Sequence, residues 1–277
     1  MLSVIIPANN EAAYIGPCLD ALLGQNLDGQ PMEVIVAANA CTDATVEIAD
    51  GYRTRFADLG YDLTVLDIAE AGKPNALNRA DAEAQGDLRA YLDADVICSE
   101  GLMVALCRAL EGNAPRYVSG KLVVAPAQSW VTRRHAHLWV RLPFMTAGVP
   151  GAGLFAVNAT GRARWKEFPQ IISDDTYVRL HFTPTERVKV PDTYLWPMVE
   201  GFARLVRVRQ RQAAGDAEIA ARYPHLLKNE GKPSLGAAGH LRLLLGHPVS
   251  YAVYVAVMLA VRLRSITSGD QGWTRGR

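Results

Sequence analysis

Residues 2–11, LSVIIPANNE, decide the fold of this chain. A short run rich in Val and Ile ends in polar residues, which is typical of a strand buried in a parallel sheet. Similar apolar runs return at 33–37, 63–68 and 88–92, with segments of helical spacing between them. Strands that alternate with helices of about 10 to 15 residues predict right-handed βαβ units and a doubly wound parallel sheet over roughly the first 125 residues.

Length and composition are those of an ordinary globular protein. The chain has 277 residues, of which 49% are hydrophobic and 21% are charged, and a formal net charge of +1. These figures exclude a disordered or low-complexity chain, and the missing basic excess excludes an unspecific nucleic-acid binder. Four cysteines without CxxC spacing predict free thiols in a reducing cytoplasm, and the first residues lack the pattern of a signal peptide.

Beyond residue 125 the alternation of strands and helices stops. The spacing of apolar residues predicts helices over 129–142 and 198–212 and a strand over 154–157. The chain is more polar from 213 to 235, so we expect a boundary near this segment.

Polar clusters follow the four predicted strands of the first half. Ligands of open α/β sheets bind beyond the carboxyl ends of the strands. One polar strand end is usually only a turn and a helix cap, but four clusters at one edge favour a binding site. The clusters are Asn9, Asn10 and Glu11; Asn39 to Asp43; Gly72, Lys73, Asn75 and Asn78; and Asp93 with Asp95.

The sequence Asp93-Ala94-Asp95 is the most specific of these clusters. Two carboxylates that leave a buried strand repel each other unless a cation or a hydrogen-bond donor compensates their charge. Mg²⁺ and Mn²⁺ bind one or two carboxylates and complete their shell with phosphate and water. We interpret the pair as a metal–diphosphate site; the alternative is a turn whose acids cap the helix after Ser99.

Six segments together resemble glycosyltransferase family two, the inverting nucleotide-sugar transferases of the GT-A fold. In chain order they are SVIIPANNEAAYIGPCLDALLGQ (3–25), EVIVAANACTDATVEIA (33–49), GKPNALNRA (72–80), YLDADV (91–96), GAGLFAVN (151–158) and SDDTYVRL (173–180). The order and spacing of these motifs match the family over about residues 2–215. The resemblance implies a Rossmann-like α/β fold with a mainly parallel sheet flanked by helices, followed by a helical C-terminal extension.

The resemblance also implies domains and an activity. One domain would cover residues 1–215, with a nucleotide-binding half (1–125) and an acceptor and catalytic half (126–215), and the extension would cover 216–277. The enzyme would be a metal-dependent, inverting glycosyltransferase of the hexosyltransferase type, with Mg²⁺ or Mn²⁺ as cofactor. It would move a sugar from a UDP- or GDP-sugar to a hydroxyl of a glycan or lipid-linked acceptor, and it would bind no nucleic acid.

The family's nucleotide-binding turns can be placed on this sequence. The turn from Pro7 to Glu11, with Asn9 at its centre, would wrap the nucleotide, and Glu11 would lie near the ribose or the base. Where the family usually has two aspartates after the second strand, this chain has Ala and Asn39. The amide of Asn39 offers a donor and an acceptor to a base edge, so the identity of the nucleotide stays open. Asp43 keeps the last acid of that motif.

The phosphate end of the donor site follows from two further motifs. By resemblance, Lys73 would lie near the base or the phosphates. Asp93 would contact the ribose or the metal-bound diphosphate, and Asp95 would be the metal ligand. A histidine completes the metal shell in some GT-A enzymes, but nothing in the sequence chooses among the six histidines present.

Ser173-Asp174-Asp175 resembles the family motif that supplies the catalytic base. An inverting transfer needs a carboxylate that takes the proton of the acceptor hydroxyl. We assign Asp175 as this base and Asp174 as the neighbour whose charge raises its pKa. The alternative is a helix N-terminus whose acids interact with the helix dipole.

Two further segments have counterparts in the family. VRVRQRQ (206–212) resembles the family's QxxRW motif: Arg211 matches its arginine and would bind the donor, but Gln212 replaces the tryptophan associated with processive synthases. We therefore expect a non-processive enzyme. Gly151 and Gly153 fit a dinucleotide fingerprint that lacks its strand–helix unit, and the family implies that they shape the floor of the acceptor site instead.

The C-terminal region holds the longest apolar stretch. Residues 249–261 are too few for the roughly 20 that span a bilayer, and an extension back to 241 includes Arg242, His247 and Pro248. Docking on protein, contact of 241–264 with a membrane surface, and spanning all stay open. The expected location is the cytoplasm, with association with the inner face of the cell membrane left open.

Two other functions stay open from the sequence. A nucleotidyltransferase that forms nucleotide sugars would need a glycine- and arginine-rich loop after the first strand, which Ala8-Asn9-Asn10 does not supply. A non-catalytic nucleotide-sugar-binding protein is favoured only by Ala38, which stands in place of an acid.

Overall fold

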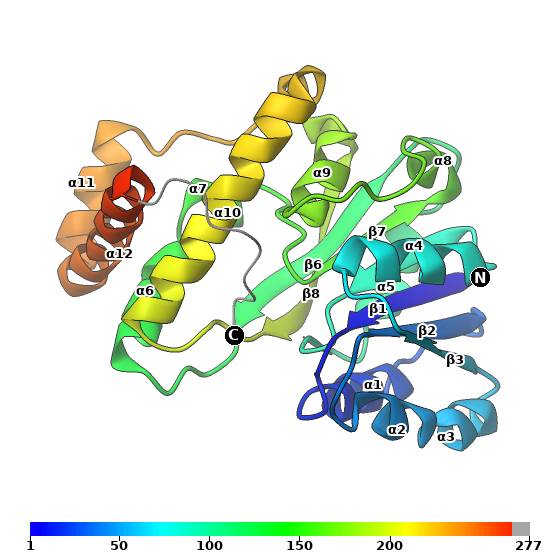
Figure 1. The fold of residues 1–277 in the computed structure, drawn as a ribbon. Helices are drawn as coiled ribbons and strands as arrows, with labels where there is room; N and C mark the ends of the chain where they lie inside the picture. The colour runs from blue at the N-terminus through cyan, green and yellow to red at the C-terminus, as the bar shows by residue number, and fades with distance from the viewer. Residues whose placement is uncertain (268–277) are drawn as a thin grey trace. The chain divides into compact units, whose positions relative to one another are not determined.

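The structure is a computed structural model that describes residues 1–267 (Figure 1). The chain divides into two compact units, the first made of 1–123 and 149–196 and the second of 124–148 and the residues from 197 onward. The last part of the predicted extension, 268–277, lies outside the described residues.

One sheet joins eight strands of the described chain in the order β3-β2-β1-β4-β7-β6-β8-β5. The strands β1 to β4 are parallel to one another, whereas β7 is antiparallel to β4 and to β6. The predicted α/β fold with a mainly parallel sheet is confirmed. The strands are β1 (Leu2–Ala8), β2 (Met32–Asn39), β3 (Asp62–Ile68), β4 (Leu88–Leu92), β5 (Ile97–Cys98), β6 (Tyr117–Val124), β7 (Leu154–Asn158) and β8 (Arg187–Trp196).

The strand β1 is the centre of the parallel part. Val4 lies opposite Val34 of β2 on one side and Ala90 of β4 on the other. All three side chains are fully buried. Helices cover both faces of the sheet in this region, so an uninterrupted apolar run is stable here. A strand with one face in solvent would instead alternate apolar and polar residues.

Helices of the first unit lie on both sides of this sheet. In Figure 1, α1, α2 and α3 lie below β1 to β3, and α4 lies above them. Pro17 falls in the first turn of α1, where its missing N–H costs no hydrogen bond. The helices are α1 (Ile15–Leu23), α2 (Thr45–Asp50), α3 (Arg53–Asp58), α4 (Lys73–Glu83), α5 (Leu102–Ala109), α8 (Ala159–Arg162) and α9 (Asp174–Leu180).

The second unit is helical. Its main elements are α6 (Trp130–Trp139), α7 (Pro143–Thr146), α10 (Phe202–Arg222), α11 (Gly236–Gly246) and α12 (Pro248–Thr267). A small core joins α10 and α12 through Leu205, Val206, Val257 and Val261. The predicted helical extension is confirmed, and α10 continues through residue 215, where the sequence suggested a boundary. No helix within the described residues is long and apolar enough to cross a bilayer.

Candidate active site

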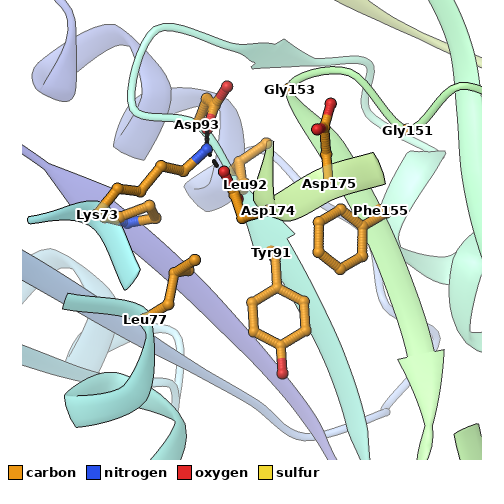
Figure 2. Close-up of a pocket in the computed structure, with 11 residues that line it drawn as sticks. Lys73, Leu77, Tyr91, Leu92, Asp93, Gly151, Gly153, Phe155, Asp174 and Asp175 are labelled. Carbon is orange, nitrogen blue, oxygen red and sulfur yellow. Dashed lines mark hydrogen bonds and ion pairs between the residues drawn. The ribbon is translucent and has the colours of Figure 1, made fainter. Parts of the chain in front are cut away.

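A pocket opens in the first unit where β1 and β4 end, and α4, α9 and the segment before β7 complete it (Figure 2). It brings together five residues that the sequence analysis assigned to the donor and catalytic sites. Its lining residues are Pro7, Lys73, Leu77, Tyr91, Leu92, Asp93, Gly151, Gly153, Phe155, Asp174 and Asp175.

Lys73 connects two of the pocket's acids. Its Nζ lies 2.9 Å from Oδ1 of Asp93 and 3.2 Å from Oδ2 of Asp174. Burial alone would lower the pKa of Lys73, but the carboxylates of Asp174 and Asp93 outweigh it and raise the pKa above its usual value. The first residue of α4, the turn after β4 and the first residue of α9 therefore meet around one ammonium group, although they lie far apart in the sequence.

Asp175, the residue after Asp174, has a raised pKa. Its Oδ1 accepts a hydrogen bond from the backbone N–H of Thr176 at 2.6 Å. Burial and the neighbouring charge of Asp174 raise the pKa of Asp175 from 3.8 to about 6, against the opposing effect of Lys73. A carboxyl group with this pKa is ionised at neutral pH and basic enough to accept a proton from a hydroxyl group, as the proposed base requires.

The raised pKa gives a direct test. In an NMR titration of the aspartate carboxyl carbons of the metal-free protein, we expect one resonance with its midpoint at about 6. Asp175→Asn should remove that resonance. Because the base works ionised, the rate should fall as the pH drops through this midpoint, by about tenfold per pH unit. If every carboxyl group titrated near 3.8, the ordinary value, the assignment of a base with a raised pKa would be wrong.

Two glycines shape the floor of the pocket. Gly151 and Gly153 have φ angles of +69° and +75°, a region that side chains rarely adopt. A Cβ at Gly151 would overlap the hydroxyl of Tyr117, and one at Gly153 would overlap the ring of Trp196. The carbonyl of Gly153 also accepts a hydrogen bond from the N–H of Asp93 at 2.8 Å. The pair therefore fixes the floor next to the acids, and its role toward an acceptor stays a prediction.

Aromatic side chains that the motifs did not predict as site residues lie under this floor. Tyr91 stacks on Phe155 with ring centroids 4.9 Å apart, and Phe155 stacks on Tyr117 at 5.5 Å. Tyr117 is fully buried, and within residues 1–267 its hydroxyl has no hydrogen-bond partner. Tyr91 and Phe155 lie inside two of the quoted motifs, which is the signal that could have found them.

A buried ionic network holds Tyr91 in place. Its hydroxyl donates to Oδ1 of Asp81 at 2.6 Å, and the same carboxylate accepts from Nη1 of Arg89 and Nε of Arg162, both at 2.7 Å. Burial would raise the pKa of Asp81, but these hydrogen bonds and the charge of Arg162 lower it below its ordinary value. The network anchors α4 and α8 to β4 beneath the pocket. Nothing in the spacing of Asp81, Arg89 and Arg162 could have predicted it.

Asn39 and Asn9 connect the turns beside the pocket and do not line it. Asn39 is buried: its Nδ2 donates to the carbonyl of Ala8 at 2.8 Å, and its Oδ1 accepts from the N–H of Gly72 at 3.1 Å. Asn9 donates to the carbonyls of Asn39 and Ala40. These bonds join the ends of β1 and β2 to the start of α4, so the geometry favours a structural role for Asn39.

Glu11 and Asp43 also lie in these turns and outside the pocket lining. The carboxylate of Asp43 accepts from the N–H of Ala12 at 3.1 Å and from the N–H of Thr45 at 3.0 Å. The slight desolvation of this exposed side chain would raise the pKa of Asp43, but the hydroxyl of Thr45 and these two N–H groups lower it. The N–H of Glu11 donates to the hydroxyl of Thr45 at 2.8 Å. The turns are thus held together from within, and contact with a nucleotide stays a prediction for both acids.

The donor set around Asp93 fits one kind of metal site. Asp93 lines the pocket, whereas Asp95 is buried two residues further on and is not a lining residue. Within the described residues there is no group of three or more His, Cys, Asp and Glu side chains that could hold a metal ion. The described residues therefore do not fit a metal site whose ligands all come from the protein. Two hard carboxylates do fit Mg²⁺ or Mn²⁺ whose shell is completed by substrate phosphate.

Arg211 lies on α10, in the second unit. Its predicted contact with the donor therefore stays a prediction.

Comparison with known proteins gives a consistent family. Residues 3–166 match the family described as Glycosyl transferase family 2. Glycosyltransferase AglE of Haloferax volcanii is 34% identical over 94 residues, which are 34% of this chain and 30% of that protein. The match thus spans less than a third of that relative's length.

Solved structures share the fold over nearly the whole chain. The mannosyltransferase PcManGT from Pyrobaculum calidifontis, solved with GDP-Man and Mn²⁺, has a TM-score of 0.60 at 23% identity, over 98% of this chain and 76% of that one. TarS of Staphylococcus aureus, solved with UDP-GlcNAc, has a TM-score of 0.54 at 16% identity, over 95% of this chain and 82% of that one.

Proposed function

The chain belongs to glycosyl transferase family 2, and on this basis we propose that it transfers a sugar from a nucleoside diphosphate sugar to an acceptor hydroxyl, with inversion at the anomeric carbon. The observation that carries the proposal is the placement of Lys73, Asp93, Asp174 and Asp175 in one pocket at the carboxyl ends of the parallel strands. Ligands of open α/β sheets bind at this edge.

The donor is a UDP- or GDP-sugar. PcManGT was solved with GDP-Man and TarS with UDP-GlcNAc, so the shared fold accommodates both nucleotides. In this chain the ammonium of Lys73, which lines the pocket, would face the diphosphate. The turns that carry Asn9, Glu11 and Asp43 would hold the nucleoside, and Arg211 would add a positive charge near the donor.

The metal is Mg²⁺ or Mn²⁺, bound by Asp93 and Asp95. When bound, such an ion stabilises the negative charge that develops on the departing nucleoside diphosphate. The carboxylate of Asp93 is paired with Lys73, and this ion pair orientates it in the pocket.

Asp175 removes the proton of the acceptor hydroxyl as that oxygen attacks the sugar. Its raised pKa places the protonated and ionised forms close enough in free energy for this transfer near neutral pH. Asp174 supports the raised pKa and binds Lys73. The acceptor is a glycan or a lipid-linked glycan, extended by one sugar at a time.

The location that we propose is the cytoplasm, at or near a membrane. The four cysteines are free thiols, and Cys18, Cys98 and Cys107 are buried. Free thiols are stable in a reducing compartment.

A thermal-shift panel of nucleotide sugars, with and without Mn²⁺, tests donor and metal together. A ligand at one hundred times its Kd stabilises a protein by about 2.7 kcal/mol, which is several degrees in Tm. We expect one UDP- or GDP-sugar to give this shift only with Mn²⁺, and Asp95→Ala to abolish the metal-dependent part. Asp58→Ala changes an exposed acid on α3 and should retain the metal-dependent part of the shift.

The outcomes of the panel separate the alternatives. Equal shifts in Asp95→Ala and in the unchanged protein would rule out the metal assignment. A donor that binds but is never consumed would favour a non-catalytic binding protein. Release of pyrophosphate from a nucleoside triphosphate and a sugar phosphate would identify a nucleotidyltransferase.

A further inference from the structure

The helix α12 has an inner face that packs within the second unit. Ser250, Val257 and Val261 are buried on this face. The ring of Tyr254 on the same face stacks on His135 of α6, with centroids 5.2 Å apart. Packing against α6 and α10 therefore accounts for one side of the helix.

The opposite face of α12 is exposed and apolar. Its residues recur at intervals of three and four positions, the spacing of one helix face, and every one of them is apolar. Leu259 is 55% exposed and Leu263 is 66% exposed. The stripe is Val249, Ala252, Ala256, Leu259 and Leu263.

The neighbouring helix α11 adds to this exposed apolar surface. It has no buried residue, and Leu241, Leu244 and Leu245 are 56%, 41% and 74% exposed. The two helices lie side by side (Figure 1). Of the fourteen large apolar side chains found exposed within the described residues, seven lie between 241 and 263. We call Leu241, Leu244, Leu245 and the α12 stripe the C-terminal apolar surface.

Charge on α11 and α12 has one sign. From 236 to 267 the sequence has three basic residues, Arg242, Arg262 and Arg264, and no acidic residue. A solvated helix face would carry charges of both signs. Pairing of two copies through this surface would bring the arginines of one copy toward those of the other, whereas an anionic surface would attract them all.

From this surface we propose that α11 and α12 bind a membrane that contains anionic phospholipids. The exposed leucines enter the boundary between headgroups and acyl chains, and the arginines pair with lipid phosphates. The helices lie in the interface and do not cross it, in keeping with the hydropathy of the described helices. This binding goes beyond the transfer reaction, since it needs neither donor nor metal.

Cosedimentation of the whole protein with vesicles tests the proposal without any substrate. We expect binding to phosphatidylcholine vesicles that contain phosphatidylglycerol, and much weaker binding to pure phosphatidylcholine. High salt should weaken the binding, because it screens the arginines. Equal binding to both vesicles, or binding to neither, would overturn the proposal.

Two sets of variants separate the apolar from the electrostatic contribution. Leu245→Gln with Leu259→Gln should weaken binding at least about tenfold, because two exposed leucines no longer enter the membrane. Leu59→Gln, which changes a leucine that is 51% exposed in the first unit, should not weaken it. Arg242→Gln should lower the affinity for the vesicles about fivefold. Arg204→Gln, which changes an exposed arginine of α10, should leave this affinity unchanged.

Folding and self-association are checked on the same samples. The changed residues are exposed, so Tm should stay unchanged. If the unchanged protein ignored vesicles but formed dimers that the double leucine variant lost, the surface would bind a second copy and the lipid proposal would be wrong. Transfer to a soluble acceptor would still test the proposed reaction, so either proposal can fail alone.

Discussion

Asp175→Asn should lower kcat by about a thousandfold and leave donor binding unchanged. A positioned general base contributes roughly two to four orders of magnitude to a rate, and asparagine has the same shape without the ability to take a proton. The side chain is partly buried and accepts a hydrogen bond from Thr176, which an amide oxygen also accepts. The fold should therefore tolerate the change.

The measurement pairs single-turnover kinetics with the thermal shift given by the donor and Mn²⁺. Asp58→Asn, on an exposed position of α3, controls for the loss of one negative charge. Retained donor binding with lost transfer identifies a chemical role. Full activity of the Asp175 variant would show that another residue is the base. Loss of donor binding would mean that the side chain of Asp175 holds the donor.

Gly151→Ala should destabilise the protein by about 2 to 4 kcal/mol. A Cβ at this position would overlap the hydroxyl of the fully buried Tyr117. Overpacking in a core costs about 1 to 3 kcal/mol, and the positive φ adds about 1 kcal/mol for a residue with a Cβ. Denaturant unfolding measures the sum.

Two matched variants separate the overlap from the backbone strain. Gly60 has a φ of +74° and nothing within 4 Å of its ideal Cβ, so Gly60→Ala should show the strain alone. Tyr117→Phe removes the overlapped oxygen, and adding it to Gly151→Ala should recover part of the packing cost, because Cζ of residue 117 would still lie 2.8 Å from the added Cβ. Equal losses for Gly60→Ala and Gly151→Ala would contradict the packing argument.

The strands, and the site residues that follow them, can be predicted from the sequence, because regular periodicity and the positions of strand ends determine both. Buried Val and Ile runs identify β1 and β2 without ambiguity. Because parallel strands end at one edge, the order of strands and helices along the chain is enough to place Asp93 and Lys73 together. The motif around Asp174 and Asp175 completes the pocket, although no local rule brings α9 to this edge.

Other features depend on pairings across the sheet that no local pattern encodes. Tyr117 lies under the pocket because β6 pairs with β7 in one register. Asn39 has a side chain of a type that often binds ligands. Both ends of its amide, however, form hydrogen bonds with backbone groups that lie more than 30 positions away. Long-range hydrogen bonds of this kind decide whether a polar side chain supports a turn or faces a ligand.

The bridge made by Lys73 implies that donor and metal would bind cooperatively. One ammonium group faces Asp93 and Asp174, with Asp175 beside them, so the empty pocket is already rich in negative charge. In the proposed reaction, a diphosphate would add more negative charge, and a metal ion at Asp93 would compete with the ammonium for the same carboxylate. Each ligand would thus supply the counter-charge that the other lacks. The affinities for metal and donor would then rise by the same factor, as reciprocity of coupled binding requires.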